Sequence, residues 1–198
     1  MDQTKTQPQA ASENDLFGRL DIRIGKVLTV KEHPDADSLY VEEIDVGEDT
    51  PRTIVSGLRK FVPITEFVEK FVLVLCNLPP RKMRGIMSNG MVLCASKTNI
   101  VVDSVSASET TTCVVELLEP DSPERVVPGE RVVITGQENS KPDPVLKPKE
   151  KIWEKCEEKL KSRSGGGAPV AAYNECVLIS SKCGALFLPL TLKEYVVS

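Results

Sequence analysis

Residues 20–56 read LDIRIGKVLTVKEHPDADSLYVEEIDVGEDTPRTIVS, and their hydrophobic pattern sets the fold class. Between residues 20 and 30, apolar side chains alternate with mostly polar neighbours, which is the two-residue period of a half-buried strand. The period breaks at Gly25-Lys26, where a β-bulge is expected. His33-Pro34-Asp35-Ala36-Asp37 is typical of a turn, because proline fixes φ and aspartate bonds nearby backbone N–H groups. Second and third strands are predicted over Leu39–Val46 and Arg52–Ser56.

The next forty residues complete a mainly β unit. Pro63 is expected to begin a short helix, because apolar residues recur at helical spacing over residues 64–71. Residues 71–77, FVLVLCN, are almost continuously apolar and predict a strand buried on both faces. Residues 78–90 are predicted as a loop and residues 91–95 as another strand. Three strands, a short helix and two strands is the order of a five-stranded OB barrel, with the helix between strands three and four. A five-stranded α+β sandwich remains open.

The composition changes after residue 118. The proline-rich residues 141–149 predict a tether, Lys149–Lys161 a helix with an apolar stripe, and residues 162–167 a flexible link. Short strands are predicted within 113–118, 131–135 and 176–197. The expected organisation is a disordered tail over 1–15, an OB-fold domain over 16–117, and a small α+β domain over 118–198 that packs against the barrel.

Composition and charge restrict the possible functions of this 198-residue chain. Its 40% apolar and 27% charged residues are ordinary for a globular protein. No apolar run approaches the ~18 residues of a membrane span, and the polar N-terminus does not resemble a secretory signal. A cytoplasmic location is therefore expected. The six cysteines form no Cys-x-x-Cys pair, and the first three (Cys76, Cys94 and Cys113) are expected to be reduced, buried thiols.

His33 is the single histidine, which disfavours zinc sites and histidine-dependent catalysis. We expect no catalytic residue, metal or cofactor. His33, Asp35 and Asp37 offer three possible metal ligands within one turn, but the turn itself accounts for all three. Lys82-Met83-Arg84 faintly resembles a synthetase nucleotide loop, and the chain has no accompanying nucleotide-binding motif.

Charge is segregated along the chain, although the net charge is −4. Residues 21–49 carry three basic and nine acidic side chains, a net charge of −6. Residues 52–97 carry eight basic and two acidic ones, a net charge of +6. A local electrostatic field of this kind can steer a polyanion to the protein. The alternative interpretation is that the charged residues scatter over a solvated surface in the folded protein.

The loop LPPRKMRGIMSNG (78–90) contains the densest group of cations in this block. In an OB barrel, the loop between strands four and five is one of two that bind nucleic acid. Here it carries Arg81, Lys82 and Arg84, and Arg59 and Lys60 extend the same face from the end of the third strand. Arginine can hold a phosphate through two parallel hydrogen bonds, and lysine adds a mobile charge.

Aromatic residues are too few for a binder that stacks many bases. They make up 5% of the chain, and at least two of the three phenylalanines in residues 52–97 fit core positions. The expected ligand is therefore a folded RNA that is bound through its backbone and 2′-hydroxyl groups. Trp153 is expected to anchor the two parts of the chain to each other rather than to stack on a base.

Long motifs carry a resemblance to a known family. Residues 20–58, followed by LCNLPPRKMRGIMSNGMVLCAS (75–96), closely resemble the tRNA-binding domain of the endothelial monocyte-activating polypeptide II type. This module occurs in tyrosyl-, methionyl- and lysyl-tRNA synthetases and in the auxiliary proteins of multisynthetase complexes. The likeness continues through PGERV (128–132), KIWEKCEEKL (151–160) and NECVLIS (174–180).

The resemblance implies a non-enzymatic module that binds tRNA with little regard to its identity and serves a synthetase in cis or in trans. It also implies a monomer whose C-terminal part imitates a dimer partner, with an internal pseudo-dimer interface. Carried over by position, the tRNA-contacting residues are Asn77, Arg81, Lys82, Met83, Arg84, Ser88 and Met91.

Two other functional classes remain. Some members of the family act as secreted cytokine-like factors, and residues 23–29, RIGKVLT, resemble a heptapeptide credited with that role. The alternation places this heptapeptide in the first strand, where it would be half buried. A peptide-binding chaperone built on the related bacterial barrel is the other alternative, and its affinity would be insensitive to salt.

Overall fold

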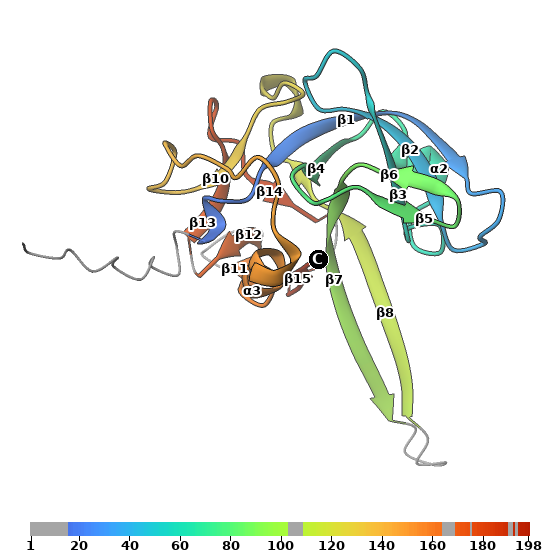
Figure 1. Ribbon diagram of the computed structural model, residues 1–198. Coiled ribbons are helices and arrows are strands. Elements are labelled where there is room, and N and C mark those ends of the chain that lie inside the picture. Colours follow the sequence, from blue (N-terminus) through green and yellow to red (C-terminus); the bar gives the residue numbers. More distant parts are fainter. Residues whose placement is uncertain (1–15, 103–108, 164–168, 175, 190–191, 193) are drawn as a thin grey trace, which may run out of the picture.

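The computed structural model describes residues 16–102, 109–163, 169–174, 176–189, 192 and 194–198; the side chains of 100–102 and 109–110 are excluded. The predicted tail over 1–15 and most of the predicted link over 162–167 lie outside the described residues. The described chain is mainly β, and it forms one large open sheet with two small two-stranded sheets (Figure 1).

The sequence pattern of residues 20–56 produces the first three strands. β1 (Ile22–Glu32) lies between β2 (Tyr40–Asp45) and β4 (Phe71–Leu75) and is antiparallel to both. β3 (Arg52–Ser56) pairs with β2, and β7 (Met91–Val102) pairs with β4. The predicted helix is α2 (Ile64–Phe67), between β3 and β4. The β1 bulge lies between Val27 and Thr29, two residues beyond its predicted position.

Side chains of β2 and β4 pack directly over Gly25 in β1. A Cβ atom on it would lie 2.6 Å from Ile44 Cγ2 and 2.9 Å from Val74 Cγ2. The neighbouring strands can therefore pack this tightly only because the residue has no side chain.

The five strands predicted for the OB barrel are neighbours in the large sheet, in the order β3-β2-β1-β4-β7. β3 and β7 do not pair as strands in the described chain, so the sheet is not closed, and the five-stranded barrel stays a prediction. Instead, residues just before β7 occupy the edge of β3. Asn89 N donates to Thr53 O at 2.9 Å, and Val55 N donates to Ser88 Oγ at 3.0 Å.

The segment predicted as the 78–90 loop contains a hairpin. β5 (Arg81–Met83) and β6 (Ile86–Ser88) pair antiparallel, with Met83 opposite Ile86. The strand predicted for residues 91–95 is also longer than expected. As β7, it runs to Val102 and pairs with β8 (Glu109–Leu117), so that the two strands project from the body as an arm (Figure 1).

The C-terminal part continues the same sheet. β15 (Val196–Val197) pairs with β7 and connects it, in order, to β11 (Leu160–Arg163), β12 (Val170–Tyr173), β13 (Cys176–Ser180) and β10 (Val132–Ile134). β9 (Glu119–Pro120) pairs with β14 (Phe187–Leu188), and short 3₁₀ turns cover Pro123–Arg125 and Pro148–Glu150.

The predicted 149–161 helix is shorter than expected. Only α3 (Ile152–Glu157) is α-helical, and residues from Leu160 onward form β11. Pairing of β11 with β12 places Leu160 opposite Tyr173 in the core, and this tertiary contact overrides the helical periodicity.

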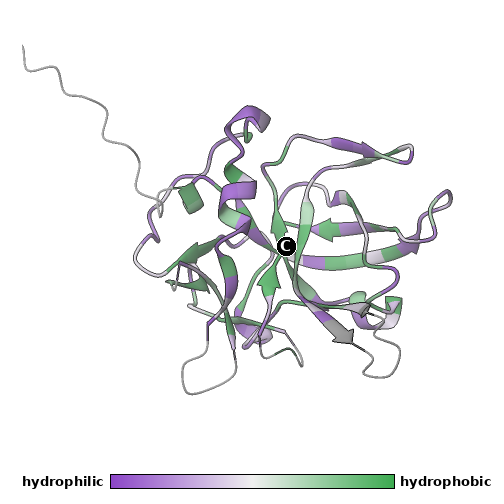
Figure 2. Ribbon diagram, turned by 90° about the horizontal axis from the view of Figure 1, so that it is seen from below, coloured by the Kyte–Doolittle hydropathy of each residue, from purple (hydrophilic) through white to green (hydrophobic). Residues whose placement is uncertain are grey.

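Two apolar clusters make the core. In Figure 2 the central strands are largely green, the colour of hydrophobic residues. One cluster fills the space enclosed by β1–β4, α2 and the start of β7. The other packs Ile22, Leu73 and Leu93 against Leu160, Tyr173 and Phe187 of the C-terminal part. The regions predicted as two domains therefore share a core, and their division at residue 117 stays a prediction.

Candidate nucleic-acid interface

The β5–β6 hairpin presents the densest group of cations on a tight turn. Its two central residues, Arg84 and Gly85, have φ values of 45° and 99°. Positive φ at both positions is the geometry of a two-residue type I′ turn, which matches the right-handed twist of the flanking strands. Glycine adopts this conformation without strain, whereas Arg84 adopts it at a cost.

His33 joins the β1–β2 turn to this hairpin. Its side chain is buried, Nδ1 accepts a hydrogen bond from Asp35 N at 3.1 Å, and Nε2 lies 3.3 Å from Met83 O. Because a carbonyl only accepts, the proton must be on Nε2, which leaves Nδ1 as the acceptor. His33 is thus a structural link, in agreement with its interpretation as part of a turn.

Four cations gather in one cavity between that turn and the hairpin. This cavity, the basic groove, has a volume of about 590 Å³ and is lined by Lys60, Arg81, Lys82 and Arg84 together with Asp35–Leu39 and Met83. Within the part of the chain that the structure describes, none of the four cations has a carboxylate oxygen within 4.0 Å. Their charge is therefore available to an anion.

The other four cations of residues 52–97 are paired. Arg52, Arg59, Lys70 and Lys97 lie 2.6, 2.7, 2.9 and 3.6 Å from Glu48, Glu32, Glu119 and Glu194, respectively. Arg52 also donates to the backbone oxygens of Cys76 and Asn89, and its bond to Glu48 lowers the pKa of that carboxyl group. Tertiary pairing thus divides the basic block into four structural cations and four available ones.

Arg59 and Lys60 are adjacent in sequence but differ in environment. Arg59 contacts Glu32 and, at 3.7 Å, Asp37, whereas Lys60 is exposed and lines the basic groove. Of these two predicted site residues, only Lys60 is therefore among the cations that are available to an anion.

Asn77 and Ser88 are buried and have hydrogen-bond partners within the chain. Asn77 Oδ1 accepts from Asp21 N at 3.1 Å, and its Nδ2 donates to Arg19 O and Asp143 O, both at 2.9 Å. Ser88 Oγ accepts from Val55 N and donates to Gly90 O at 3.1 Å. Ser88 thus joins β6 to β3, whereas Asn77 joins segments outside the basic residues of the hairpin. The contact of both side chains with RNA stays a prediction.

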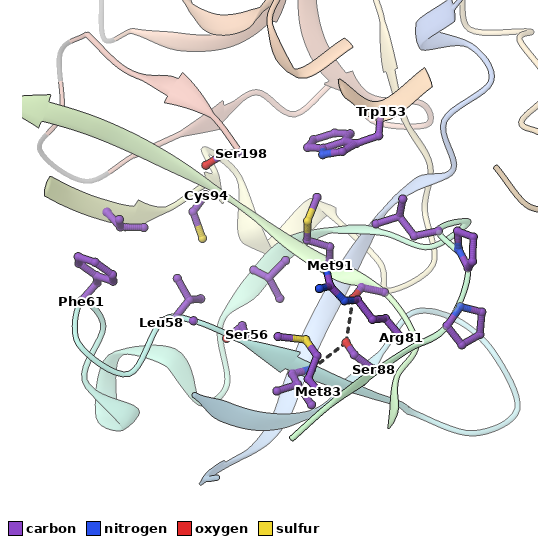
Figure 3. Close-up of a pocket in the computed structure, with 18 of the residues that line it drawn as sticks. Ser56, Leu58, Phe61, Arg81, Met83, Ser88, Met91, Cys94, Trp153 and Ser198 are labelled. Carbon is purple, nitrogen blue, oxygen red and sulfur yellow. Dashed lines mark hydrogen bonds between the residues drawn. The ribbon is translucent and has the colours of Figure 1, made fainter. Parts of the chain in front are cut away.

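Met83 and Met91 line a second, mostly apolar cavity of about 810 Å³ (Figure 3). Arg81 and Met83 line both cavities, so the basic groove and this apolar cavity meet along β5. Trp153 of α3 and Phe61 also line the apolar cavity, at its two ends. Sequence reasoning did not assign either aromatic to the site, because only the tertiary fold brings them beside β5.

The described residues hold no cluster of three or more histidine, cysteine or acidic side chains that could bind a metal ion. All six cysteines are free thiols, and burial raises the pKa of Cys76 and Cys94 to about 12. Cys113 is exposed, contrary to expectation, because the β7–β8 arm projects away from the core. None of the described helices is long and apolar enough to cross a membrane.

The heptapeptide of residues 23–29 lies within β1. Its first half pairs with β4 and its second half with β2, and Ile24, Gly25 and Val27 are buried. Its expected half-buried position in the first strand is confirmed.

Comparison with known proteins identifies the family. A model described as "putative tRNA binding domain" matches residues 22–123. Cytoplasmic tyrosine–tRNA ligase of Gallus gallus is 54% identical over 137 residues, which cover 69% of this chain and 24% of the ligase. Aminoacyl tRNA synthase complex-interacting multifunctional protein 1 of Cricetulus griseus is 46% identical over 153 residues, which cover 77% and 38% of the two chains. The chain thus spans less than half of these relatives.

A solved structure shares most of the fold. The crystal structure of the C-terminal domain of p43 from Plasmodium vivax is 34% identical, has a TM-score of 0.73, and is matched over 92% of this chain and 98% of that one. The chain belongs to the tRNA-binding domain family, whose members occur in aminoacyl-tRNA synthetases and in proteins associated with them. The resemblance inferred from the sequence motifs is confirmed.

Proposed function

We propose that this chain is a non-catalytic module that binds folded tRNA with little dependence on its identity and supplies it to an aminoacyl-tRNA synthetase in cis or in trans. The observation that carries the proposal is the basic groove, where Lys60, Arg81, Lys82 and Arg84 lie together without carboxylate partners among the described residues. Cations placed in this way bind phosphates and release counterions.

The strand order supports an OB-type module as the carrier of this groove. β1 to β4 and β7 have the order of the five OB strands, and α2 has the expected place. Arg81, Lys82 and Arg84 lie on the connection between β4 and β7, and Lys60 lies between β3 and α2. The C-terminal part, which shares the second apolar cluster, is proposed as the pseudo-dimer partner within a monomer. Relatives named as cytoplasmic ligases favour a cytoplasmic location.

Replacing Arg81, Lys82 and Arg84 together by alanine tests the proposal. The variant is expected to bind tRNAs of different identity more weakly by similar factors, and its log–log salt slope should fall by about 2 to 3. Lys141, Lys161 and Lys182, which are exposed elsewhere, provide a matched triple-alanine control with the same change in charge. Unchanged tRNA affinity in the groove variant would refute the site.

Supply of tRNA requires a separate measurement. Fusing the chain to a synthetase that lacks such a module is expected to lower KM for tRNA and leave kcat unchanged, because tethering raises the effective concentration of tRNA. If the fusion does not lower KM although the chain binds tRNA, the module binds but does not deliver.

A further inference from the structure

The apolar cavity beside the basic groove is not used by phosphate binding. It is enclosed by β3, β5 and β7, by the Pro79-Pro80 segment, and by Trp153 of α3 (Figure 3). Its residues come from both parts of the chain. A site of this kind exists only in the assembled molecule.

The serine hydroxyl groups on the cavity wall have partners within the chain. The Ser88 hydroxyl accepts from Val55 N and donates to Gly90 O, and the Ser56 hydroxyl donates to the buried carboxyl group of Glu42. Burial keeps the Cys94 thiol neutral by raising its pKa to about 12. The remaining surface suits the face of a planar ring better than it suits an ion.

Trp153 provides a supported aromatic surface in this cavity. One part of its side chain packs against the second apolar cluster, and the half-buried remainder lines the cavity. Figure 3 shows the Met91 side chain between the indole and Arg81. A ring held in this way loses little conformational entropy when another ring stacks on it.

We propose that this cavity holds an unpaired base of the bound RNA, stacked against Trp153 and Met91, while the phosphate of that nucleotide lies on Arg81. The inference rests on the proposed function, because it uses the same RNA chain. Beyond the proposed function, the base site would give the protein a preference for RNA that carries an unpaired base. Continuity with the basic groove through Arg81 and Met83 favours a nucleotide over an apolar peptide, because a nucleotide combines a planar ring with an anion.

Trp153 is the single tryptophan of the chain, so its fluorescence reports on this cavity alone. We expect tRNA to quench it in proportion to binding, as followed in parallel by the anisotropy of labelled tRNA. A fully paired RNA duplex is expected to bind the basic groove and leave the fluorescence nearly unchanged. An apolar peptide serves as the competing ligand.

Two substitutions separate stacking from packing. Trp153→Leu keeps an apolar side chain and is expected to weaken tRNA binding about ten-fold, a typical loss when an aromatic partner of a base is removed. Trp153→Phe retains a ring and is expected to stay within about two-fold of the parent affinity. Val127→Ser, at an apolar residue that is 55% exposed, is the control, and thermal unfolding verifies each fold.

The outcomes distinguish this inference from the proposed function. If tRNA binds without quenching Trp153 and Trp153→Leu binds equally well, the base site is refuted and the proposed function stands. If the parent chain does not bind tRNA, both fail. Quenching by the apolar peptide and not by tRNA would overturn the base site in favour of a peptide site. The fluorescence of the parent chain decides the question even if Trp153→Leu does not fold.

Discussion

Asn77 joins three segments of the chain through one buried amide group. Its Oδ1 and Nδ2 atoms form hydrogen bonds with Asp21 N directly before β1, with Arg19 O in the N-terminal turn, and with Asp143 O in the segment before α3. From the sequence, the same residue was assigned to RNA contact by position in the family motif. The structure adds a stabilising role that a linear motif cannot show, because its partners lie 56 to 66 residues away.

Asn77→Ala is therefore expected to act on stability. It leaves buried backbone groups without partners, which should lower the free energy of unfolding by roughly 2 to 4 kcal/mol. Urea denaturation measures this change, with Asn139→Ala at an exposed asparagine as control. The folded variant is expected to keep the parent affinity for tRNA and the parent salt slope. Unchanged stability with lost affinity would instead indicate that Asn77 contacts the RNA.

Glu42 is a fully buried acid on β2. Ser56 Oγ donates to its Oε1, and Oε2 has no hydrogen-bond partner in the described chain. Desolvation disfavours the charged form and raises the pKa of Glu42 from 4.5 to about 7, although the bond from Ser56 opposes this shift. The folded protein therefore holds this proton at pH values where the unfolded chain has released it.

The sign of the pH dependence follows from this proton. Between pH 4.5 and about 7 the folded state binds more protons than the unfolded one, so the contribution of Glu42 to stability decreases as pH rises through this window. The total loss is about 3 kcal/mol. Glu42→Gln is expected to flatten the dependence of Tm on pH between 5 and 8, as calorimetry would measure, whereas Glu66→Gln at an exposed site should not. An unchanged slope in Glu42→Gln would show that the carboxyl group is ionised in the folded protein.

At the scale of elements, the β5–β6 hairpin was the least predictable part of the site. Its strands have three residues each, too few for a clear two-residue period, and Pro79-Pro80 and Gly85 favour a loop. Its shape depends on contacts distant in sequence, namely His33 to Met83 O and Ser88 to Val55 N. β1 to β3 were predictable from their strand-like hydrophobic patterns and from turns that carry proline, glycine and aspartate, and β4 was predictable from its almost continuous apolar run.

Arg84→Asn tests whether an arginine at this turn position lowers the stability of the protein while it supplies a positive charge. Asparagine tolerates the positive φ of 45° better than arginine, so the variant is expected to gain about 0.5 to 1 kcal/mol of stability. It should also bind tRNA more weakly, because one available cation is lost. Lys82→Asn is the matched control, since it removes the same charge from a strand position and should lower affinity with no gain in stability. Thermal unfolding and tRNA titration measure the two effects. Equal stability changes in both variants would show that the turn carries no strain.

At the scale of the whole molecule, two close backbone contacts join the predicted parts. Gly47 and Gly129 have φ values of 74° and 84°, and a Cβ on Gly47 would lie 2.6 Å from Gly129 Cα. Next to them, Gly129 N donates to Ile24 O, and Ile24 N donates to Glu130 O, both at 2.8 Å. β1 thus contacts the C-terminal part along the same residues that begin the predicted barrel, a juxtaposition that composition alone could not indicate.

The sequence predicts that residues 52–97 form a basic block, but it does not predict which of their cations form a site. The net charge of +6 over residues 52–97 identifies a basic block, but which four of its eight cations stay without a carboxylate partner depends on carboxylates placed by the fold. Asp35 and Asp37, interpreted from the sequence as turn residues only, line the basic groove itself. Their charges oppose a phosphate bound there, so they limit the affinity that the four cations provide.

Removing those two charges is expected to strengthen tRNA binding. Asp35→Asn combined with Asp37→Asn keeps the turn chemistry and should raise affinity about five-fold at low ionic strength, with the gain decreasing as salt screens the groove. Asp37→Asn also removes a charge 3.7 Å from Arg59, which adds to the gain. Asp49→Asn combined with Glu124→Gln, at exposed positions outside the groove, is the control for net charge. If both pairs raise affinity equally, tRNA responds to the overall charge of the molecule; a gain confined to the groove pair locates the phosphates between the β1–β2 turn and the β5–β6 hairpin.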